Sequence, residues 1–330
     1  MAHYLVTGAA GFIASRVVGM LLDGGHTVTG IDNLNDAYDV RMKEYRLAQL
    51  LGRPCFTFHR FDITDREAME RFAVEASHQA CAQPFEAVIN LAARAGVRQS
   101  LDNPWVYVQT NITGTLNLLE LCRQHGIPKF ILASTSSIYG ANAPLPTPED
   151  ADSDHPLQPY AASKKGAEAL CHSYHYLYNL DVTVLRYFTV YGPAGRPDMV
   201  MFRFAQWISE GRPVRLNGDG EQSRGFTYLD DIARGTILAL KPLGYEIINL
   251  GGHETIKINA LIQMMEELIG KKAHVERGPL RPEDMLANWA SIDKARRLLD
   301  WEPQVSLVDG VTRLVTWYYA ERSWASQIET

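Results

Sequence analysis

The strongest constraint on the fold is an alternation that runs through the first half of the chain. Short apolar runs rich in β-branched residues are separated by segments whose apolar residues recur at helical spacing. Strand, helix and strand repeated in this way predict an α/β fold with a doubly wound parallel sheet. Helices then cover both faces, which explains why the runs are almost wholly apolar. The expected strands are Tyr4–Thr7, Thr27–Ile31, Phe56–Phe61, Ala87–Leu91, Lys129–Ala133 and Val182–Arg186, and the expected helices include Arg16–Leu22, Arg66–Ala76 and Thr113–His125.

Beyond about residue 192 the sequence changes character. Pro and Gly interrupt short elements, as in Gly192-Pro193, Gly195-Arg196-Pro197 and Gly211-Arg212-Pro213. This pattern predicts a smaller α/β lobe whose loops form one side of a cleft. A chain of 330 residues is long enough for about two domains. We expect a first domain over residues 1–191 and a second over 192–330, with one strand and one helix near 225–255 returning to the first.

Composition removes several classes of function. Lys and Arg number 32 and Asp and Glu 38, a net charge of −6, and no basic block occurs, so nucleic-acid binding is not expected. No stretch approaches the roughly 18 apolar residues of a membrane span, and the chain enters a strand at once without a leader pattern. The four cysteines lie far apart, and His172 and His175 have no third partner nearby, so neither a metal site nor a disulfide framework is expected. Free thiols are typical of the cytoplasm.

A glycine-rich turn follows the first expected strand. In the segment Thr7–Ala14, Gly8 permits a tight turn and Gly11 lets the backbone approach a pyrophosphate at a helix N-terminus. Asp32 ends the next strand at the spacing expected for an acid that accepts hydrogen bonds from ribose hydroxyls. An acid at this position repels a 2′-phosphate, so the pattern favours NAD over NADP. The turn therefore predicts a Rossmann dinucleotide site.

The ends of the second and third strands should recognise the nucleoside of that cofactor. Asn33 stands where an arginine would suit NADP. Asp62-Ile63 ends the third strand, where a carboxylate can reach the adenine amino group.

Tyr160 and Lys164 stand four residues apart and share one face of an expected helix. A Tyr-x-x-x-Lys pattern alone carries little information. Here it follows the glycine-rich turn and a strand that ends in Ser134-Thr135-Ser136-Ser137, which places a phenol, an ammonium and a hydroxyl beside a nicotinamide. A free tyrosine has a pKa of about 10. We expect Lys164 and the positive ring to lower this pKa until Tyr160 can take a proton from a carbinol.

Together these motifs resemble the extended short-chain dehydrogenase/reductase family, and within it the nucleotide-sugar 4-epimerases. The resemblance implies an NAD-binding N-terminal domain, NAD that stays bound through turnover, and a C-terminal lobe for the nucleotide sugar. It also implies homodimers built as a four-helix bundle, for which the matching helices are Val106–His125 and Tyr160–Asn179. The similar segments are Thr7–Ala14, Asn111–Thr115, Ser134–Gly140, Tyr160–Lys164, Arg186–Pro193 and Arg281–Asp284.

The residues at the end of the fifth strand separate the reactions of this family. The 4,6-dehydratases resemble one another in carrying Thr-Asp-Glu here, because elimination of water needs an extra acid and base, and the decarboxylases carry Thr-Ser-Glu. This chain has Thr135-Ser136-Ser137 and lacks that carboxylate. A 4-keto sugar then has one ready fate, the return of hydride, so the sequence predicts 4-epimerisation.

The segment Arg186–Met199 indicates the sugar. Thr189 stands where UDP-galactose 4-epimerases have Asn, and Phe-Thr-Val-Tyr-Gly-Pro followed by Gly-Arg-Pro-Asp-Met is similar to UDP-glucuronate 4-epimerases. Ala92–Arg98 is similar to the same group, with Arg94 in place of Gln. A C6 carboxylate needs donors, and Arg is suited to bind one through two hydrogen bonds. The expected donors are Arg196, Thr189, Ser136 and Ser137, and the expected reaction converts UDP-glucuronate to UDP-galacturonate.

The resemblance assigns the remaining contacts. Arg224 and Arg281 match the family's phosphate-binding arginines, Asp284 matches a ribose-binding acid, and Val214–Asn217 should lie beside the uracil. The expected catalytic residues are Tyr160, Lys164 and Thr135. The expected cofactor-binding residues are Gly8, Gly11, Phe12, Ile13, Asp32, Asn33, Asp62, Ile63, Leu91, Ala92, Ala93, Asn111, Ser134, Tyr160, Lys164 and Tyr187. The expected substrate-binding residues are Ser136, Ser137, Thr189, Arg196, Val200, Arg215, Asn217, Arg224, Arg281 and Asp284.

Two other functions stay open at the level of sequence. One is a 4-epimerase of neutral UDP-glucose and UDP-galactose or of N-acetylated UDP-sugars. The other is a non-catalytic NAD-binding regulator on the same fold. The intact set of Thr135, Tyr160 and Lys164 argues against the regulator, because a protein that only binds NAD does not need all three.

Overall fold

Seven parallel strands form the large sheet of this protein, seen in a computed structural model that describes residues 1–78, 83–252, 254–279 and 287–330. The strand order is β10-β6-β5-β4-β1-β2-β3, so the winding direction reverses between β1 and β4. In such sheets ligands bind beyond the carboxyl ends of the strands at the point of reversal. The strands are β1 (His3–Thr7), β2 (Thr27–Asp32), β3 (Phe56–Arg60), β4 (Ala87–Asn90), β5 (Lys129–Thr135), β6 (Asp181–Tyr187) and β10 (Tyr245–Leu250). The predicted doubly wound sheet is confirmed.

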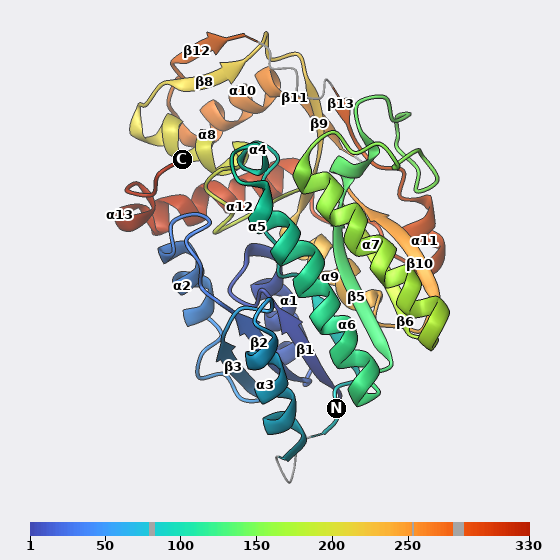
Figure 1. Cartoon of the computed structure of the whole chain (residues 1–330). Helices are drawn as coiled ribbons and strands as arrows, with labels where there is room; N and C mark the ends of the chain where they lie inside the picture. The colour runs from blue at the N-terminus through green and yellow to red at the C-terminus, as the bar shows by residue number, and fades with distance from the viewer. Residues whose placement is uncertain (79–82, 253, 280–286) are drawn as a thin grey trace.

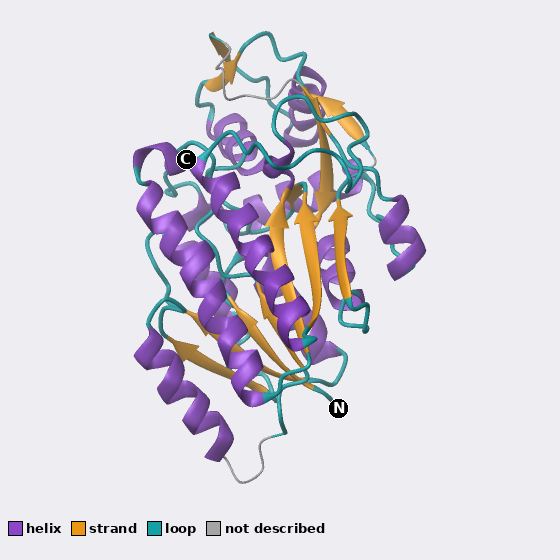
Figure 2. Ribbon diagram, turned by 45° about the vertical axis from the view of Figure 1, so that its right-hand side comes forward, coloured by secondary structure: helices purple, strands orange, loops and turns teal. Residues whose placement is uncertain are grey.

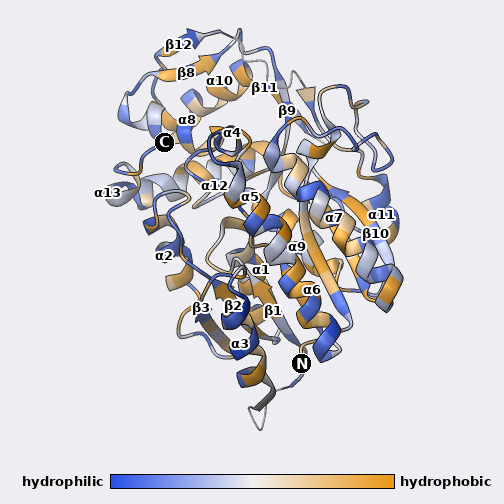
Figure 3. Ribbon diagram, viewed as in Figure 1, coloured by the Kyte–Doolittle hydropathy of each residue, from blue (hydrophilic) through white to orange (hydrophobic). Residues whose placement is uncertain are grey.

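Helices cover both faces of this sheet (Figures 1 and 2). One face packs against α1 (Phe12–Asp23), α9 (Leu229–Leu238) and α11 (Asp293–Leu299), and the other against α3 (Arg66–His78), α6 (Gly114–His125) and α7 (Pro159–Tyr178). Each face has its own hydrophobic core, and the strands between them are the apolar centre of the molecule (Figure 3). α2 (Arg41–Ala48) lies beside α1.

The paired helices α6 and α7 run side by side along the outside (Figures 1 and 2). Proline stands at the first position of α7, where its missing N–H costs nothing, and Asn179 ends the helix in the left-handed region at φ 54°. The shorter segments α4 (Gln99–Asp102), α5 (Pro104–Tyr107) and the π-helical turn η1 (Val108–Thr113) lead directly into α6. The helix expected over Thr113–His125 is therefore the last part of a longer helical run that begins at α4.

The rest of the chain forms a second, smaller α/β part above the carboxyl ends of the strands (Figure 1). A four-stranded sheet contains β7 (Thr189–Tyr191), β9 (Ser223–Tyr228), β11 (Thr255–Lys257) and β13 (Ala287–Asn288), and β8 (Val214–Asn217) pairs with β12 (Val275–Gly278). Around them lie α8 (Val200–Glu210), α10 (Ile258–Ile269), α12 (Leu307–Ala320) and the short α13 (Arg322–Ala325). α9 and β10 lie between β9 and β11 in sequence but pack with the large sheet.

Within the described residues, no helix combines the length and the apolar character that crossing a bilayer requires.

Candidate active site

The glycine-rich turn between β1 and α1 is too tight for side chains. Gly8 adopts φ +70°, and a Cβ on it would lie 2.8 Å from the backbone nitrogen of Ala92. A Cβ on Gly11 would lie 2.7 Å from the carbonyl oxygen of Gly8. α1 begins directly after Gly11, at Phe12 and Ile13, without a side-chain cap, so its first N–H groups are left for a ligand. These residues fit the pyrophosphate of a dinucleotide.

Asp32, at the end of β2, is buried beside this turn. Its Oδ2 accepts the backbone N–H of Ala10 at 3.1 Å, and its Oδ1 accepts that of Leu34 at 2.8 Å. Lys43 Nζ lies 3.7 Å from Oδ1 and was not expected from the sequence. A carboxylate can accept about four hydrogen bonds, so Asp32 keeps capacity for ribose hydroxyls.

A hydrogen bond joins the ends of β2 and β3 next to Asp32. Asn33 Nδ2 donates to Asp62 Oδ2 at 2.6 Å, and Asp62 Oδ1 accepts the backbone N–H and the hydroxyl of Thr64. Ile63 is buried under α6, where a Cβ on Gly114 would lie 2.6 Å from its Cδ1. The two polar residues predicted separately for the nucleoside therefore form one hydrogen-bonded pair.

The loop after β4 lines the opposite side of the turn. Thr7 Oγ1 donates to Asn90 and accepts the N–H of Ala92, which fixes the half-buried residues Leu91, Ala92 and Ala93 beside Gly8. Asn111 holds the next residue of the loop, because its side chain bonds both the N–H and the carbonyl of Arg94 and also the hydroxyl of Ser163. The Asn111 amide thus joins this loop to α7.

The end of β5 holds the catalytic candidates of α7. Lys164 Nζ donates to the carbonyl oxygen of Ala133 at 2.8 Å, and the Tyr160 hydroxyl is hydrogen-bonded to the Thr135 side chain. Thr135 Oγ1 also accepts the N–H of Ser137 at 3.2 Å. Tyr160, Lys164 and Thr135 therefore come together as the sequence predicts.

Burial dominates the titration of this pair. It raises the pKa of Tyr160 above its usual value, although the Thr135 hydrogen bond and the charge of Arg196 act to lower it. Burial also lowers the pKa of Lys164 to about 8, with the charge of Glu168 acting in the opposite direction. The expected lowering of the phenol's pKa is not met in the protein alone. Further positive charge must be added near Tyr160 before it can serve as a base at neutral pH.

Arg196 reaches Tyr160 from the loop between β7 and α8. Its guanidinium forms an ion pair with Asp198, at 2.6 Å from Nη2 and 3.0 Å from Nε, and Nη2 lies 3.5 Å from the carbonyl oxygen of Ala95 in the β4 loop. The ring of Tyr107 packs edge-on against Tyr160, with centroids 6.1 Å apart. The cation of Arg196 and the ring of Tyr107 thus lie beside Tyr160.

A buried arginine ties this loop to the glycine-rich turn. The side chain of Arg46, on α2, donates to the carbonyl oxygens of Ala194 and Gly195, to that of Ala10 at 3.5 Å and to the hydroxyl of Tyr38 at 2.7 Å. Ala194 has φ 52°, a left-handed conformation that costs a non-glycine residue about 1 kcal/mol or more. Arg46 holds the carbonyl of that strained residue and therefore fixes the segment that carries Arg196.

The other expected site residues fall into three groups within the described residues, and two more lie outside them. Ser134 and Tyr187 are buried, with the Ser134 hydroxyl on Glu168 and the Tyr187 hydroxyl on Thr236. Ser136, Ser137, Thr189 and Val200 lie around Thr135 or on β7 and the start of α8, with Ser136 Oγ accepting from Asn288. Arg215, Asn217 and Arg224 lie on β8 and β9, in the smaller part, and Arg215 is exposed. Arg281 and Asp284 lie outside the described residues.

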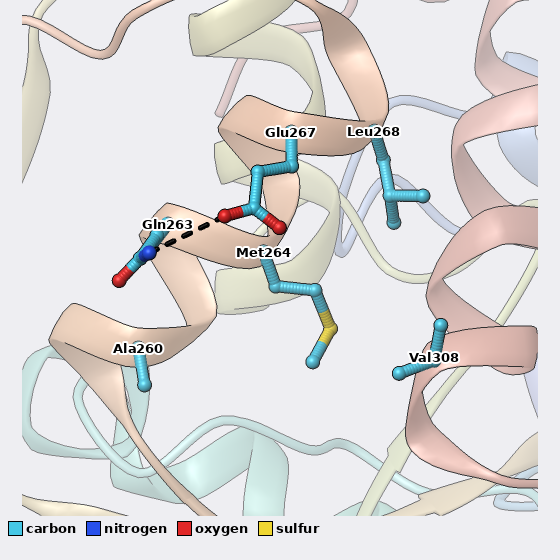
Figure 4. Close-up of a pocket in the computed structure, with 6 residues that line it drawn as sticks. All are labelled: Ala260, Gln263, Met264, Glu267, Leu268 and Val308. Carbon is cyan, nitrogen blue, oxygen red and sulfur yellow. Dashed lines mark hydrogen bonds between the residues drawn. The ribbon is translucent and has the colours of Figure 1, made fainter.

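A separate surface hollow lies between α10 and the start of α12 (Figure 4). It encloses about 250 Å³, and its one carboxylate, on Glu267, accepts the amide of Gln263 at 3.3 Å. Its lining is Ala260, Gln263, Met264, Glu267, Leu268 and Val308. None of the site residues above lines it. Over the described ranges, no three His, Cys, Asp or Glu side chains converge as a metal ion would require.

The model of the NAD-dependent epimerase/dehydratase family matches residues 4–251, which include the glycine-rich turn, Thr135, Tyr160 and Lys164. The chain belongs to the NAD-dependent epimerase/dehydratase family. The UDP-glucuronate 4-epimerase of Thermodesulfobacterium geofontis (strain OPF15) is 56% identical over 318 residues, 96% of this chain and 96% of that protein.

Two solved structures of epimerases are similar over nearly the whole chain. The UDP-glucuronic acid 4-epimerase from Bacillus cereus, in complex with UDP-glucuronic acid and NAD, has 37% identity and a TM-score of 0.89, covering 97% of this chain and 99% of that one. The UDP-glucose 4-epimerase from Thermotoga maritima, with UDP-glucose, has 34% identity and a TM-score of 0.87, covering 97% and 99%.

The site of this epimerase/dehydratase family member also contains five residues that the sequence motifs do not mark. They are Lys43, Arg46, Tyr107, Glu168 and Asp198. Sequence signals existed for two of them, because Glu168 lies four residues beyond Lys164 and Asp198 two beyond Arg196. Lys43 and Arg46 contact segments far away in sequence, and no local pattern marks them.

Proposed function

We propose that this protein is a UDP-glucuronate 4-epimerase, which uses NAD to interconvert UDP-glucuronate and UDP-galacturonate. The observation that carries the choice of substrate is the position of Arg196: its Nη2 lies 3.5 Å from the Ala95 carbonyl oxygen, which also accepts from Tyr107, the ring packed edge-on against Tyr160. A cation this close to the proton-transferring phenol suits a sugar that bears a carboxylate one carbon beyond C5. The similarity to UDP-glucuronate 4-epimerases over nearly the whole chain supports the same assignment.

The proposed NAD site is formed by Gly8, Gly11 and the first turn of α1 at the pyrophosphate and by Asp32 at a ribose. When bound, NAD supplies a reversible acceptor for the hydride of a carbinol. Asn33 and Asp62 complete the site at the adenine end.

Tyr160 moves the proton in the proposed reaction. Its Oη takes the proton of the sugar C4 hydroxyl and later returns a proton to the same oxygen, after the 4-keto sugar has turned its other face. Thr135 hydrogen-bonds to Tyr160 and steadies the reacting oxygen. Lys164 contributes a positive charge held in place by the Ala133 carbonyl. General acid–base catalysis of this kind is worth roughly 10²–10⁴-fold.

The missing carboxylate after Thr135 restricts the outcome. Ser137 stands where both the 4,6-dehydratases and the decarboxylases carry Glu, so the 4-keto sugar returns to a carbinol. A 4-keto uronate is a β-keto acid, which loses CO₂ when its carboxylate bond aligns with the carbonyl π system. Arg196, Thr189 and the two serines therefore have a second role, to hold the carboxylate out of that alignment.

The test is a turnover assay with purified protein and UDP-glucuronate, without added NAD. We expect UDP-galacturonate in the NMR spectrum and no net NADH. The matched control is Tyr160→Phe, which keeps the ring and the pocket. Absence of UDP-galacturonate from wild-type reactions that do interconvert UDP-glucose and UDP-galactose would replace this assignment by the neutral one.

One observation favours the neutral alternative, a UDP-glucose or N-acetylated UDP-sugar 4-epimerase. Asp198 already neutralises Arg196, so a uronate must compete with a carboxylate of the protein. The similarity to the Thermotoga maritima UDP-glucose 4-epimerase also fits this reading. Comparing kcat/KM for the two substrates decides between them.

We further propose that two copies pair through α6 and α7 into a four-helix bundle. The apolar side chains left exposed near these helices support this: Trp105 and Tyr176 are 76% and 80% exposed. Exposed apolar patches of this kind mark interfaces. Sedimentation at micromolar concentration should show a dimer, and Trp105→Glu should shift it to monomer. We also propose a cytoplasmic location, where UDP-sugars and NAD occur. We propose a cofactor-binding domain over residues 1–191, joined by one strand and one helix from residues 225–255, and a sugar-binding domain over 192–330.

A further inference from the structure

A buried carboxylate continues the face of α7 that carries Tyr160 and Lys164. Glu168 lies four residues beyond Lys164 and eight beyond Tyr160, and such spacings place side chains on one side of a helix. Its side chain is buried, with 3% of the residue exposed. The proposed proton transfer does not use it.

Glu168 is held on both oxygens. Its Oε1 accepts the Ser134 hydroxyl at 2.5 Å and Arg186 Nε at 3.1 Å, and its Oε2 accepts Arg186 Nη2 at 2.8 Å. Arg186 in turn donates to the Tyr139 hydroxyl at 2.9 Å and to the carbonyl of Glu149 at 3.1 Å. The carboxylate therefore has a fixed position in the interior.

Three consecutive residues of β5 bind the three residues of this helix face. The Ala133 carbonyl accepts from Lys164, and the Thr135 side chain bonds Tyr160. Between them, the Ser134 hydroxyl donates to Glu168. The Ser134–Glu168 bond therefore lies between the contacts that hold Lys164 and Tyr160 against the end of β5.

Glu168 also forms an ion pair with the buried Arg186 at 2.8 Å, and its charge acts on the buried Lys164. The other titratable group whose charge acts on Lys164 is Cys171 on the same helix, and burial raises the pKa of its thiol, which keeps it neutral. Cys122 on α6 and Tyr245 on β10 interact with Cys171, and Tyr139 on η2 (Ser136–Tyr139) interacts with Arg186; burial raises the pKa of each of these groups as well. Glu149 lies on the far side of Arg186, where its carboxylate accepts the N–H of Asn249.

We propose that Glu168 is a positioning residue for the Tyr160 and Lys164 pair: through Ser134 it fixes the end of β5, and through its charge it keeps Lys164 protonated. Burial lowers the pKa of Lys164 to about 8, and the carboxylate opposes that. Removing the carboxylate lowers this pKa further, so Lys164 loses its proton at a lower pH.

The experiment compares Glu168→Gln, Ser134→Ala and a matched control. Glu168→Gln keeps an acceptor for Ser134 but removes the charge, and Ser134→Ala does the reverse. The control is Asp231→Asn, which neutralises another buried carboxylate, paired with Arg234 on α9. Two readouts are taken: the pH profile of kcat/KM for the UDP-sugar, and the NMR titration of the Lys164 side chain, assigned with Lys164→Arg.

We expect Glu168→Gln to lower the Lys164 midpoint and the alkaline limb of the profile by roughly one pH unit. That shift costs about fivefold in kcat/KM at pH 8 and little at pH 6. Ser134→Ala should lower kcat without moving either midpoint, and Asp231→Asn should move neither. A Lys164 midpoint unchanged in Glu168→Gln, or moved equally by Asp231→Asn, overturns the proposal.

The kinetic arm rests on the proposed function, whereas the titration does not. A wild type that converts no UDP-sugar refutes the proposed function and leaves the Lys164 titration to decide the role of Glu168. If Glu168→Gln does not fold, Glu168→Asp takes its place, because it keeps the charge and is too short to reach Ser134. A normal kcat in Glu168→Asp then overturns the positioning role, and a lowered kcat at an unchanged alkaline limb supports it.

Discussion

Removal of the Asp198 carboxylate should tighten the binding of a uronate, whereas removal of the Arg196 guanidinium should weaken it. The two side chains form an ion pair in the protein alone, through contacts of 2.6 and 3.0 Å. Arg196 lowers the pKa of Asp198 although burial opposes this, so Asp198 stays charged at neutral pH. A substrate carboxylate must therefore replace Asp198 or share the guanidinium with it.

The magnitude follows from that exchange. A hydrogen bond to a charged group contributes about 1.5–3 kcal/mol, and each 1.4 kcal/mol is about tenfold in affinity. Arg196→Ala loses the bonds to the uronate outright and should raise KM for UDP-glucuronate by roughly 10- to 100-fold. Asp198→Asn leaves a neutral competitor that still accepts one bond, so KM should fall by about three- to tenfold.

The assay measures KM for UDP-glucuronate and the dissociation constant of UDP in wild type, both single variants and the double variant. UDP binding should be unchanged throughout, because the proposed diphosphate donors are elsewhere. The double variant should resemble Arg196→Ala. Arg196→Ala should also release a decarboxylated UDP-4-keto-pentose, seen by NMR, and leave NADH on the enzyme, seen at 340 nm.

Equal KM values for UDP-glucuronate in wild type, Asp198→Asn and Arg196→Ala would refute this reasoning. The pair would then be a structural feature of the loop, and the assignment of a uronate substrate would lose its physical basis. A rise in KM in both single variants would show instead that Asp198 orients Arg196 for the substrate.

Three further changes test the site. Tyr160→Phe should lower kcat by roughly 10²–10⁴-fold with UDP affinity unchanged; near-normal turnover would show that the phenol is not the proton acceptor. Gly8→Ala should abolish NAD retention, so denatured protein should release little NAD compared with wild type; stoichiometric NAD would contradict the fit of the turn. Lys164→Met should be more stable than wild type at pH 7. Burial lowers the pKa of Lys164 from its ordinary 10.5 to about 8, which means that keeping the buried ammonium charged costs about 3 kcal/mol of folding free energy. The loss of the hydrogen bond to the Ala133 carbonyl offsets part of this gain. Since the lowered pKa means that wild type gains stability as pH rises from 8 to 10.5, this advantage should shrink over that range in urea unfolding; a variant less stable at pH 7 would contradict it.

The parts of the molecule that sequence could predict are those set by local patterns. The strands were found because burial on both faces requires apolar runs, and Gly8 and Gly11 because a tight turn requires them. The grouping of Thr135 with Tyr160 followed from a strand end and a helical spacing. Only the lengths differed, as for β5, which runs on to Thr135.

The parts that sequence could not predict depend on packing between distant segments. The pKa of Tyr160 is raised because its surroundings are buried, which no motif states. The packing of α2 against the rest of the protein brings Lys43 to Asp32 and Arg46 to backbone carbonyls of two loops. Arg281 and Asp284, which the resemblance assigns to the diphosphate and the ribose, lie outside the described residues and stay predictions.

The contacts of Arg46 affect how the loop between β7 and α8, which carries Arg196, can change in evolution. Three of its acceptors are main-chain oxygens, those of Ala10, Ala194 and Gly195. Such contacts are indifferent to which side chains the loop carries but sensitive to where its backbone runs. Substitutions around Arg196 can therefore accumulate and retune the preferred sugar, whereas insertions or deletions there would leave a buried guanidinium unpaired. A loop grafted from a relative should work when its length matches.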